Sequence, residues 1–332
     1  MKILVIRFSS IGDIVLTTPV VRCLKTQLDD AEIHYATKPN FKVLFEENPY
    51  IDKMHYLTGG IGEFIAGLRK ENFDCIIDLH HNLRTTLIKT ALGVKSYSFH
   101  KLNWKKWLLV HLKINQMPDV HIVDRYLETA KKLGVKNDSL RLDYFIPAKD
   151  VVPLNWLPET HRQGYVAYVV GAQHATKKLP LNRMIELCAK MNRPIVLLGG
   201  KEDASNGEHI SSYFETKKSH EVQSNNGASN TIIYNACGKY NLNQSASLVK
   251  QARVVFAHDT GLMHVAAAFK KEVYSIWGNT VPAFGMYPYR TRYTSLENNH
   301  LSCRPCSKIG YKKCPKGHFK CMNENPFDFY LS

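Results

Sequence analysis

The sequence predicts an α/β protein made of two similar halves, each with a parallel sheet covered by helices on both faces. Three observations predict it: short β-branched runs, amphipathic stretches between them at helical spacing, and a restart of this pattern after residue 163. Strands are expected at residues 2–7, 32–36, 53–57, 73–79 and 96–99, then at 165–170, 194–198, 231–234, 254–257 and 272–277. We therefore expect domains at 1–150 and 164–300, a linker at 151–163 and a tail at 301–332.

The linker is predicted from a stretch rich in proline. Pro147, Pro153 and Pro158 interrupt residues 146–163, where no apolar periodicity is present. Because proline removes a backbone donor and disfavours helix at the preceding residue, such a stretch is typical of a connection between domains.

Composition limits the partners. The 332 residues carry 44 lysines and arginines against 29 acidic residues, a formal net charge of +15. An excess of this size favours acidic partners, which are nucleic acids, anionic membrane surfaces or phosphorylated substrates. No run reaches about 18 apolar residues, and the start Met1-Lys2-Ile3-Leu4 reads as a strand rather than a signal peptide. We expect a cytoplasmic protein.

The first strand runs into a turn and then a helix, predicted from Ile14 to Leu28 with Pro19 early in it. The turn lacks the G-x-G-x-x-G fingerprint, which argues against a nicotinamide or flavin enzyme. Asp13 lies in this turn. A carboxylate there is either a favourable partner of the helix dipole or a general base at the ligand crevice, which lies beside such loops in open α/β sheets.

The strand ending at Leu79 is followed by His80, His81 and Arg84, again on the crevice side of the sheet. A metal is disfavoured here because no third ligand stands at metal spacing. Further along, residues 101–113 combine lysines with Trp104 and Trp107. This segment predicts either contact with a membrane surface or phosphorylated glycolipid, or a solvated helix whose tryptophans pack inward.

In the second half, an apolar strand ends at His258-Asp259 and a helix follows, with Thr260 as its N-cap and Gly261 at its start. The free backbone N–H groups of such a helix start form an anion site, and His264 adds a donor one turn on. The alternative interpretation is that this segment is only a strand–helix corner of a doubly wound sheet, capped by Thr260.

Two more strand ends fall on the same rim, at residues 171–178 and 199–202. They offer hydroxyls, Lys177, Lys178 and the carboxylate of Glu202. Lysines with a helix dipole suit phosphates, and a carboxylate suits ribose hydroxyls, so this rim predicts a site for a nucleoside diphosphate without a metal.

Two motifs carry a resemblance to a known family. The segment Ser9-Ser10-Ile11-Gly12-Asp13 through Pro19, together with Asp259-Thr260-Gly261-Leu262-Met263-His264, resembles the heptosyltransferase family, glycosyltransferase family 9. The resemblance covers nearly the whole chain. It departs from the family pattern at Arg7, where relatives often have lysine, and at Leu179, where they have tryptophan.

The resemblance implies a GT-B fold, in which two Rossmann-like domains face each other across a cleft. It also implies an inverting, metal-independent transfer of a heptose or related sugar from an ADP-sugar to an acceptor linked to lipid A or the lipopolysaccharide core. Asp13 is then the general base. The donor residues are Thr176, Lys177, Glu202, Asp259, Thr260, Gly261, Leu262 and His264, and the acceptor residues are Ser10, Gly12, His80 and Arg84. No catalytic cofactor is expected, and the protein would meet the inner face of the inner membrane peripherally.

The C-terminal segment holds four of the eight cysteines: Cys303, Cys306, Cys314 and Cys321. Their spacing, opened by C-x-x-C, favours a structural zinc site or reduced thiols over disulfides.

Two other functions remain open. One is a GT-B enzyme that uses a UDP-sugar, such as an epimerase. The other is a basic nucleic-acid binder, which is disfavoured because the positive charge is spread along the chain and no RNA-binding signature is present, so no nucleic-acid partner is expected.

Overall fold

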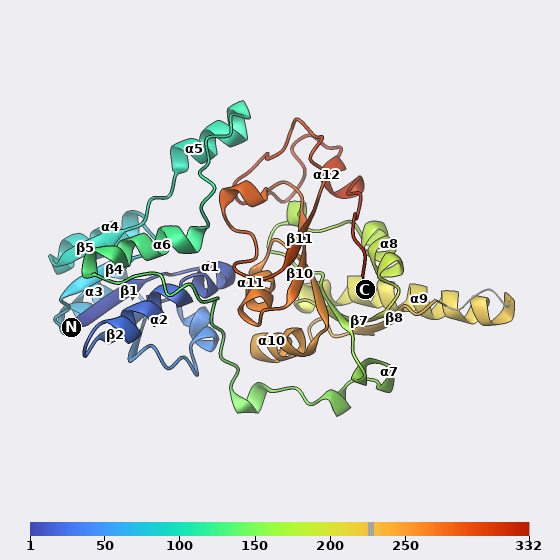
Figure 1. Cartoon of the computed structure of the whole chain (residues 1–332), viewed down its shortest axis with the longest axis horizontal. Helices are drawn as coiled ribbons and strands as arrows, with labels where there is room; N and C mark the ends of the chain where they lie inside the picture. Colours follow the sequence, from blue (N-terminus) through green and yellow to red (C-terminus); the bar gives the residue numbers. More distant parts are fainter. Residues whose placement is uncertain (225–228, 332) are drawn as a thin grey trace. The chain divides into compact units, whose positions relative to one another are not determined.

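The computed structural model describes residues 1–224 and 229–331, and its contacts divide the chain into two compact units (Figure 1). Unit 1 comprises residues 1–103 and 118–147, and unit 2 comprises residues 104–117 and the chain from 148 onward. Each unit is built on one parallel sheet, as the alternation of strands and helices predicts.

Unit 1 contains a five-stranded parallel sheet with the strand order β3-β2-β1-β4-β5. The strands are β1 (Lys2–Ile6), β2 (Glu32–Thr37), β3 (Lys53–Tyr56), β4 (Cys75–Asp78) and β5 (Lys95–Ser98). The helices are α1 (Ile11–Val15), α2 (Thr18–Gln27), η1 (Pro39–Leu44), α3 (Ile61–Arg69), α4 (Leu83–Leu92), α6 (Ile122–Ala130) and η3 (Lys131–Leu133). The central strands are buried on both faces, which explains why β1 and β4 are continuous apolar runs.

Unit 2 contains a six-stranded parallel sheet with the strand order β11-β10-β9-β6-β7-β8. The strands are β6 (Val166–Val169), β7 (Pro194–Leu198), β8 (Ile232–Asn235), β9 (Val254–His258), β10 (Glu272–Trp277) and β11 (Tyr293–Glu297). The longer helices are α8 (Leu181–Met191), α9 (Ala204–Ser224), α10 (Leu242–Gln251) and α11 (Gly261–Ala268). The shorter ones are α5 (Asn103–Trp107), η2 (Leu108–Leu112), η4 (Ala148–Asp150), η5 (Leu154–Trp156), α7 (Glu159–Arg162), η6 (Ala175–Lys177), η7 (Lys201–Asp203), η8 (Pro282–Phe284) and α12 (Lys320–Asn323).

Both strand orders contain a topological switch point, where ligands bind in open α/β sheets. In unit 1 the switch lies between β1 and β4, and in unit 2 it lies between β6 and β9. The loops that leave the carboxyl ends of these four strands carry most of the residues expected to be functional.

The helix expected from Ile14 to Leu28 is wrong in one respect, because it is two helices. Pro19 lacks a backbone N–H and its ring would clash with the carbonyl of Val15 in a continuous helix, so α1 ends and α2 begins with proline in its first turn. The hydroxyls of Thr17 and Thr18 satisfy the freed carbonyls of Ile14 and Val15, at 2.7 and 2.8 Å.

Three segments lie elsewhere than their sequence pattern suggested. Residues 104–117 group with unit 2, although they fall inside the expected range 1–150. The stretch expected as a linker contains two short helices and buries Val152 and Leu157 in the core of unit 2. The core of unit 2 contains another cluster of buried side chains, and the C-terminal segment contributes Phe327 and Phe329 to it. This segment therefore packs as part of unit 2.

Candidate functional site

The turn after β1 holds Asp13 through both of its carboxylate oxygens. Oδ1 lies 2.8 Å from the guanidinium of Arg7, and Oδ2 accepts hydrogen bonds from the backbone N–H and the hydroxyl of Ser10, at 3.2 and 2.9 Å. The side chain remains about one-fifth exposed at the start of α1. Such a carboxylate is charged, oriented and accessible.

Arg7 is the support for this carboxylate. Its guanidinium is buried and donates to the carbonyl of Ser9 at 2.6 Å, the carbonyl of Leu79 at 2.6 Å and the hydroxyl of Tyr126 at 3.0 Å. Burial, the largest single influence, lowers the pKa of Arg7, but the charge and hydrogen bond of Asp13 together with the nearby Tyr126 and Tyr35 outweigh it, and the net pKa is raised. The arginine therefore connects the turn after β1 to the end of β4.

His80 and Arg84 belong to the same edge of the sheet. His80 follows β4 and packs edge-on against Phe8 with 5.6 Å between ring centroids, while the Arg84 guanidinium lies 6.0 Å from the same ring. Burial, and after it the charge of Arg7, lowers the pKa of His80 to about 4, so its ring is neutral at pH 7. The structure thus brings Ser10, Gly12, Asp13, His80 and Arg84 to one edge of unit 1.

In unit 2, helix α11 begins directly after β9, and no side chain caps it. Thr260 occupies the N-cap position with extended backbone angles, but its hydroxyl makes no capping hydrogen bond. The expected N-cap position is correct, while the expected capping bond is not formed. Backbone N–H groups at an uncapped helix start are available to an anion. Leu262 is partly buried against the core, and His264 is buried in the first turn.

Beside this helix start, Lys177 forms an ion pair with Asp259. Its Nζ lies 2.6 Å from Oδ2 of Asp259, which also accepts a hydrogen bond from the hydroxyl of Thr280 at 2.9 Å. Both charged side chains are mostly buried. This contact joins the loop after β6 to the loop after β9 and fixes the position of the Lys177 ammonium at the switch point.

The loop after β7 contains two acidic residues with different environments. Glu202 is exposed, and no hydrogen bond or ion pair holds its carboxylate among the described residues. Asp203 is almost fully buried, pairs with Lys178 at 2.8 Å and accepts from the backbone N–H of Gly200 at 3.1 Å. Asp203 therefore shapes the loop, whereas Glu202 is the carboxylate that a ligand would reach.

His258 fixes the loop that precedes helix α8. Its buried ring lies 3.1 Å from the carbonyl of Val169 through Nδ1, and Nε2 accepts from the backbone N–H of Leu179 at 3.0 Å. Nδ1 must therefore carry the proton, and burial lowers the pKa of His258 to about 4. Leu179 itself is buried in the core.

The C-terminal segment makes hydrogen bonds to the loop after β6 and to the loop after β10. The hydroxyl of Thr176 donates to the carbonyl of Tyr311 and accepts from its backbone N–H, at 3.2 and 2.8 Å. Arg304 donates to the carbonyls of Gly278 and Thr280, at 2.6 and 3.1 Å. Thr176 is expected from the sequence to contact the sugar-nucleotide donor. In the structure its hydroxyl is hydrogen-bonded to the C-terminal segment.

The four C-terminal cysteines are free thiols that lie near enough to influence one another's pKa. Burial, and then the charges of Cys303 and Cys314, raises the pKa of Cys306, while burial raises that of Cys321 to about 12. Nε2 of His318 lies 3.9 Å from Sγ of Cys303. Within the described ranges, however, no three of these sulfurs come within 4.8 Å of one another. The donor set suits zinc, and the spacing would have to contract around an ion.

The supporting roles of three residues were not predicted from the sequence: Arg7, Asp203 and His258. Arg7 and His258 lie at or just beyond the carboxyl end of a strand and Asp203 lies in the loop after β7, and this placement was the signal available in the sequence. Their roles depend on partners such as Leu79, Lys178 and Leu179, which are distant in the sequence.

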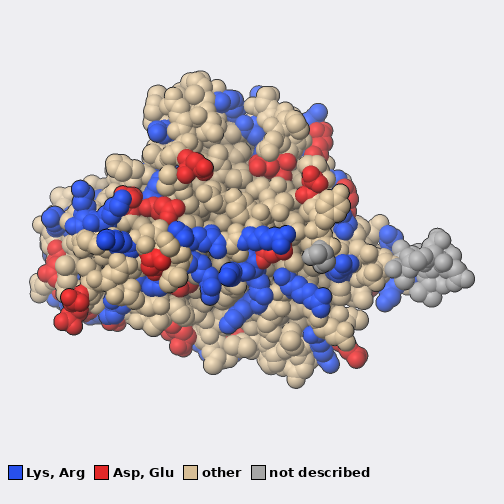
Figure 2. All heavy atoms as spheres, in the orientation of Figure 1, with Lys and Arg blue, Asp and Glu red and all other residues tan. Residues whose placement is uncertain are grey.

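The basic aromatic segment exposes its tryptophans. Trp104 and Trp107 are stacked, with 5.1 Å between ring centroids, and are 67% and 43% exposed. Leu112 and Ile114 are also about half exposed, so of the two expectations for this segment the inward-packing one is wrong. Lysine and arginine side chains are spread over the face drawn in Figure 2, with acidic side chains among them. None of the helices in the described part of the chain has the length and apolarity to cross a membrane.

Comparison with known proteins places these features in a family. The family model described as glycosyltransferase family 9 (heptosyltransferase) matches residues 61–316. Lipooligosaccharide heptosyltransferase 2 from Haemophilus influenzae is 24% identical over 86% of this chain and 85% of its own length.

Two solved structures have the same fold. The ADP-heptose lipopolysaccharide heptosyltransferase II of Escherichia coli superimposes with a TM-score of 0.69 at 19% identity, covering 98% of each chain. A second E. coli heptosyltransferase, solved with ADP, gives a TM-score of 0.64 at 19% identity, covering 91% of this chain and 95% of the other. At these identities the likeness shows the fold, two parallel-sheet α/β domains of the GT-B class.

Proposed function

Because this chain belongs to glycosyltransferase family 9, the heptosyltransferase family, we propose that it transfers a heptose from ADP-heptose to an acceptor of the lipopolysaccharide core or lipid A, with inversion at the anomeric carbon. In this proposal unit 1 binds the acceptor and unit 2 binds the donor. The relatives named above act in lipopolysaccharide or lipooligosaccharide synthesis, and one similar enzyme was solved with ADP, which supports this choice.

The observation that carries the proposal is the uncapped start of helix α11 beside Lys177. The leaving group of an ADP-sugar is ADP, whose charge grows as the glycosidic bond breaks. Backbone N–H groups, the helix dipole and the Lys177 ammonium stabilise that charge without a divalent ion. His264, Gly261 and Leu262 form the first turn around the same point, and Glu202 reaches the ribose hydroxyls.

Asp13 supplies the base. Its carboxylate takes the proton from an acceptor hydroxyl as that oxygen forms a bond to the anomeric carbon and the bond to ADP breaks on the opposite face. Displacement from the opposite face inverts the configuration. Arg7 and Ser10 orient the carboxylate, and a positioned base of this kind contributes about 10²–10⁴-fold to the rate.

The acceptor in this proposal is an anionic glycolipid. Arg84 is exposed at the edge that carries Asp13, and His80 lies beside it as a neutral donor or acceptor. The stacked pair Trp104 and Trp107 and the neighbouring lysines suit the interface of an anionic membrane, where indole rings and cations are both favoured. We therefore place the enzyme on the cytoplasmic face of the inner membrane as a peripheral protein.

Nucleotide binding tests the proposal. ADP is expected to raise the melting temperature of the protein more than UDP does, and Lys177→Ala is expected to remove most of the ADP effect. The control is Lys218→Ala, an exposed lysine on α9. A larger shift with UDP would favour the UDP-sugar alternative, and equal ADP shifts in the wild type and Lys177→Ala would remove the lysine from the donor site.

A further inference from the structure

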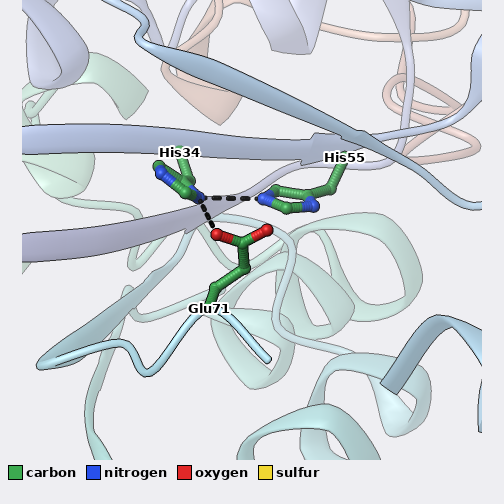
Figure 3. Close-up of side chains that lie close together, drawn as sticks. All are labelled: His34, His55 and Glu71. Carbon is green, nitrogen blue, oxygen red and sulfur yellow. Dashed lines mark hydrogen bonds and ion pairs between the residues drawn. The ribbon is translucent and has the colours of Figure 1, made fainter. Parts of the chain in front are cut away.

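Three potential metal ligands come together in unit 1 (Figure 3). His34 lies in β2, His55 in the edge strand β3, and Glu71 in the loop between α3 and β4. One potential ligand atom from each side chain lies within 4.8 Å of the other two. Among the described residues, no other group of three or more His, Cys, Asp or Glu side chains meets that limit. His34 is level with Leu4 in the middle of β1, His55 pairs with Ala36, and Glu71 lies in the loop that leads into the amino end of β4, so none of the three comes from the loops after β1 and β4 that hold Asp13 and His80.

The orientation of His34 is already set by a carboxylate. Its Nε2 lies 2.7 Å from Oε1 of Glu32, so in the neutral ring Nε2 donates its proton to Glu32 and Nδ1 keeps a lone pair. That Nδ1 lies 2.9 Å from Nε2 of His55 and 3.9 Å from Oε2 of Glu71. A carboxylate behind a histidine is the usual way in which proteins fix a metal-binding imidazole.

The distances suit a tetrahedral ion after small movements. Two nitrogens that each lie about 2.05 Å from a tetrahedral zinc are roughly 3.3 Å apart. The observed separations of 2.9 and 3.9 Å lie on either side of that value. His55 is partly exposed and lines a cavity of about 260 Å³ together with Met54, Tyr56, Thr58, Glu63 and Phe64. That cavity provides a route for the ion.

Two lysines lie close to these ligands, and their positive charges would repel a bound cation. Lys53 pairs with Oε1 of Glu71 at 2.6 Å, and Lys2 lies 3.8 Å from Oε2 and 3.5 Å from Glu32. The carboxylates of Glu32 and Glu71 balance these charges, and Lys2 contacts Oε2 of Glu71 at the longer distance of 3.8 Å. Binding of an ion would break that contact, which makes Lys2 a sensitive position for a test.

We propose that Nδ1 of His34, Nε2 of His55 and the carboxylate of Glu71 bind a divalent transition-metal ion of the zinc type, with Glu32 orienting His34. Imidazole nitrogens with one carboxylate form a donor set that zinc favours. On binding, the proton on Nε2 of His55 moves to Nδ1 of the same ring through solvent, so neutral rings release no net proton. The ion would tie the edge strand β3 to the loop after α3.

Zinc titration of the full-length chain tests the site. Because the C-terminal cysteines also offer zinc ligands, the readout is the difference in stoichiometry between the wild type and His55→Ala, measured by calorimetry against a competing chelator. The wild type is expected to bind one more zinc per chain than His55→Ala, and Glu71→Gln is expected to behave like His55→Ala. His209→Ala, which removes an exposed histidine of α9, is the matched control and should bind like the wild type. Equal stoichiometry in wild type and His55→Ala overturns the proposal.

Two further variants test the electrostatics. Glu32→Gln is expected to weaken this zinc about 10–100-fold, as loss of a carboxylate behind a metal-binding histidine does in other proteins. Lys2→Gln is expected to strengthen it severalfold, a gain that impaired folding would not produce. An unchanged or weaker affinity in Lys2→Gln contradicts the proposal. Zinc-edge anomalous diffraction from wild-type crystals grown with zinc adds a test without mutation, since a peak must lie between the three side chains.

Discussion

Replacing Asp13 with asparagine is expected to abolish most of the activity while the fold survives. Asparagine keeps the size of the side chain but has no charge with which to take a proton. Loss of a general base lowers kcat by about 10²–10⁴-fold, which corresponds to roughly 3–5 kcal/mol of barrier. The KM for the donor should change little, because Asp13 is not among the residues assigned to ADP-heptose.

The stability change is expected to be much smaller than the change in barrier. The variant loses the ion pair with Arg7, but the arginine keeps its hydrogen bonds to Ser9, Leu79 and Tyr126. A hydrogen bond to a charged group contributes about 1.5–3 kcal/mol, and the partial exposure of Asp13 favours the lower end. We therefore expect Tm to fall by roughly 5 °C.

The assay is release of ADP at saturating donor and acceptor, with thermal unfolding measured on the same samples. Asp29→Asn, at an exposed aspartate, is the control and should retain wild-type kcat. A folded Asp13→Asn enzyme whose kcat lies within about threefold of the wild type would refute the assignment of the base.

Three further predictions concern the supports of the site. Because the folded pKa of His258 is about 4 against an ordinary value of about 6.5, the unfolded chain takes up its proton first as pH falls, so this contribution to stability is full above about pH 6.5 and is lost toward pH 4. In His258→Gln the urea midpoint should depend less on pH across that window, and an unchanged slope would contradict the lowered pKa. The double variant Trp104→Ala/Trp107→Ala should bind anionic vesicles more weakly in sedimentation while transferring sugar to a soluble acceptor at the wild-type rate; unchanged vesicle binding would exclude these tryptophans as the membrane contact. If the C-terminal cysteines hold zinc, a strong chelator should weaken ADP binding in calorimetry, since Arg304 and Cys306 hold the loop 278–280; the chelator should leave ADP binding unchanged in Cys303→Ser/Cys306→Ser, where this metal is already lost.

Ten of the eleven strands in the described residues were predicted, β11 being missed, and the central ones were predictable because parallel strands buried on both faces must be apolar. The runs at β1, β4, β6 and β9 are short, β-branched and bounded by turn residues, and they formed the sheets that the sequence predicts. The position of Thr260 at a helix start was predictable for a similar reason, since cap residues act locally. The division of α1 from α2 was also encoded locally, in Pro19.

Contacts between distant segments were not predictable from one sequence. No local signal indicates that Arg7 reaches Leu79, or that His34 meets His55 on the neighbouring strand. Register between strands decides such pairs, and periodicity within one strand carries no information about it. For the same reason, the cysteine-rich segment could be recognised by its spacing, while its packing against Thr176 could not.

The product of a single reaction tests the central claim most directly. ADP-heptose and a lipid A–core acceptor are incubated with the enzyme, the nucleotide released is identified, and the anomeric configuration of the new linkage is determined by NMR. The account predicts ADP as the nucleotide and a linkage opposite in configuration to the donor. Transfer with retained configuration, or turnover that requires a UDP-sugar instead, would contradict it.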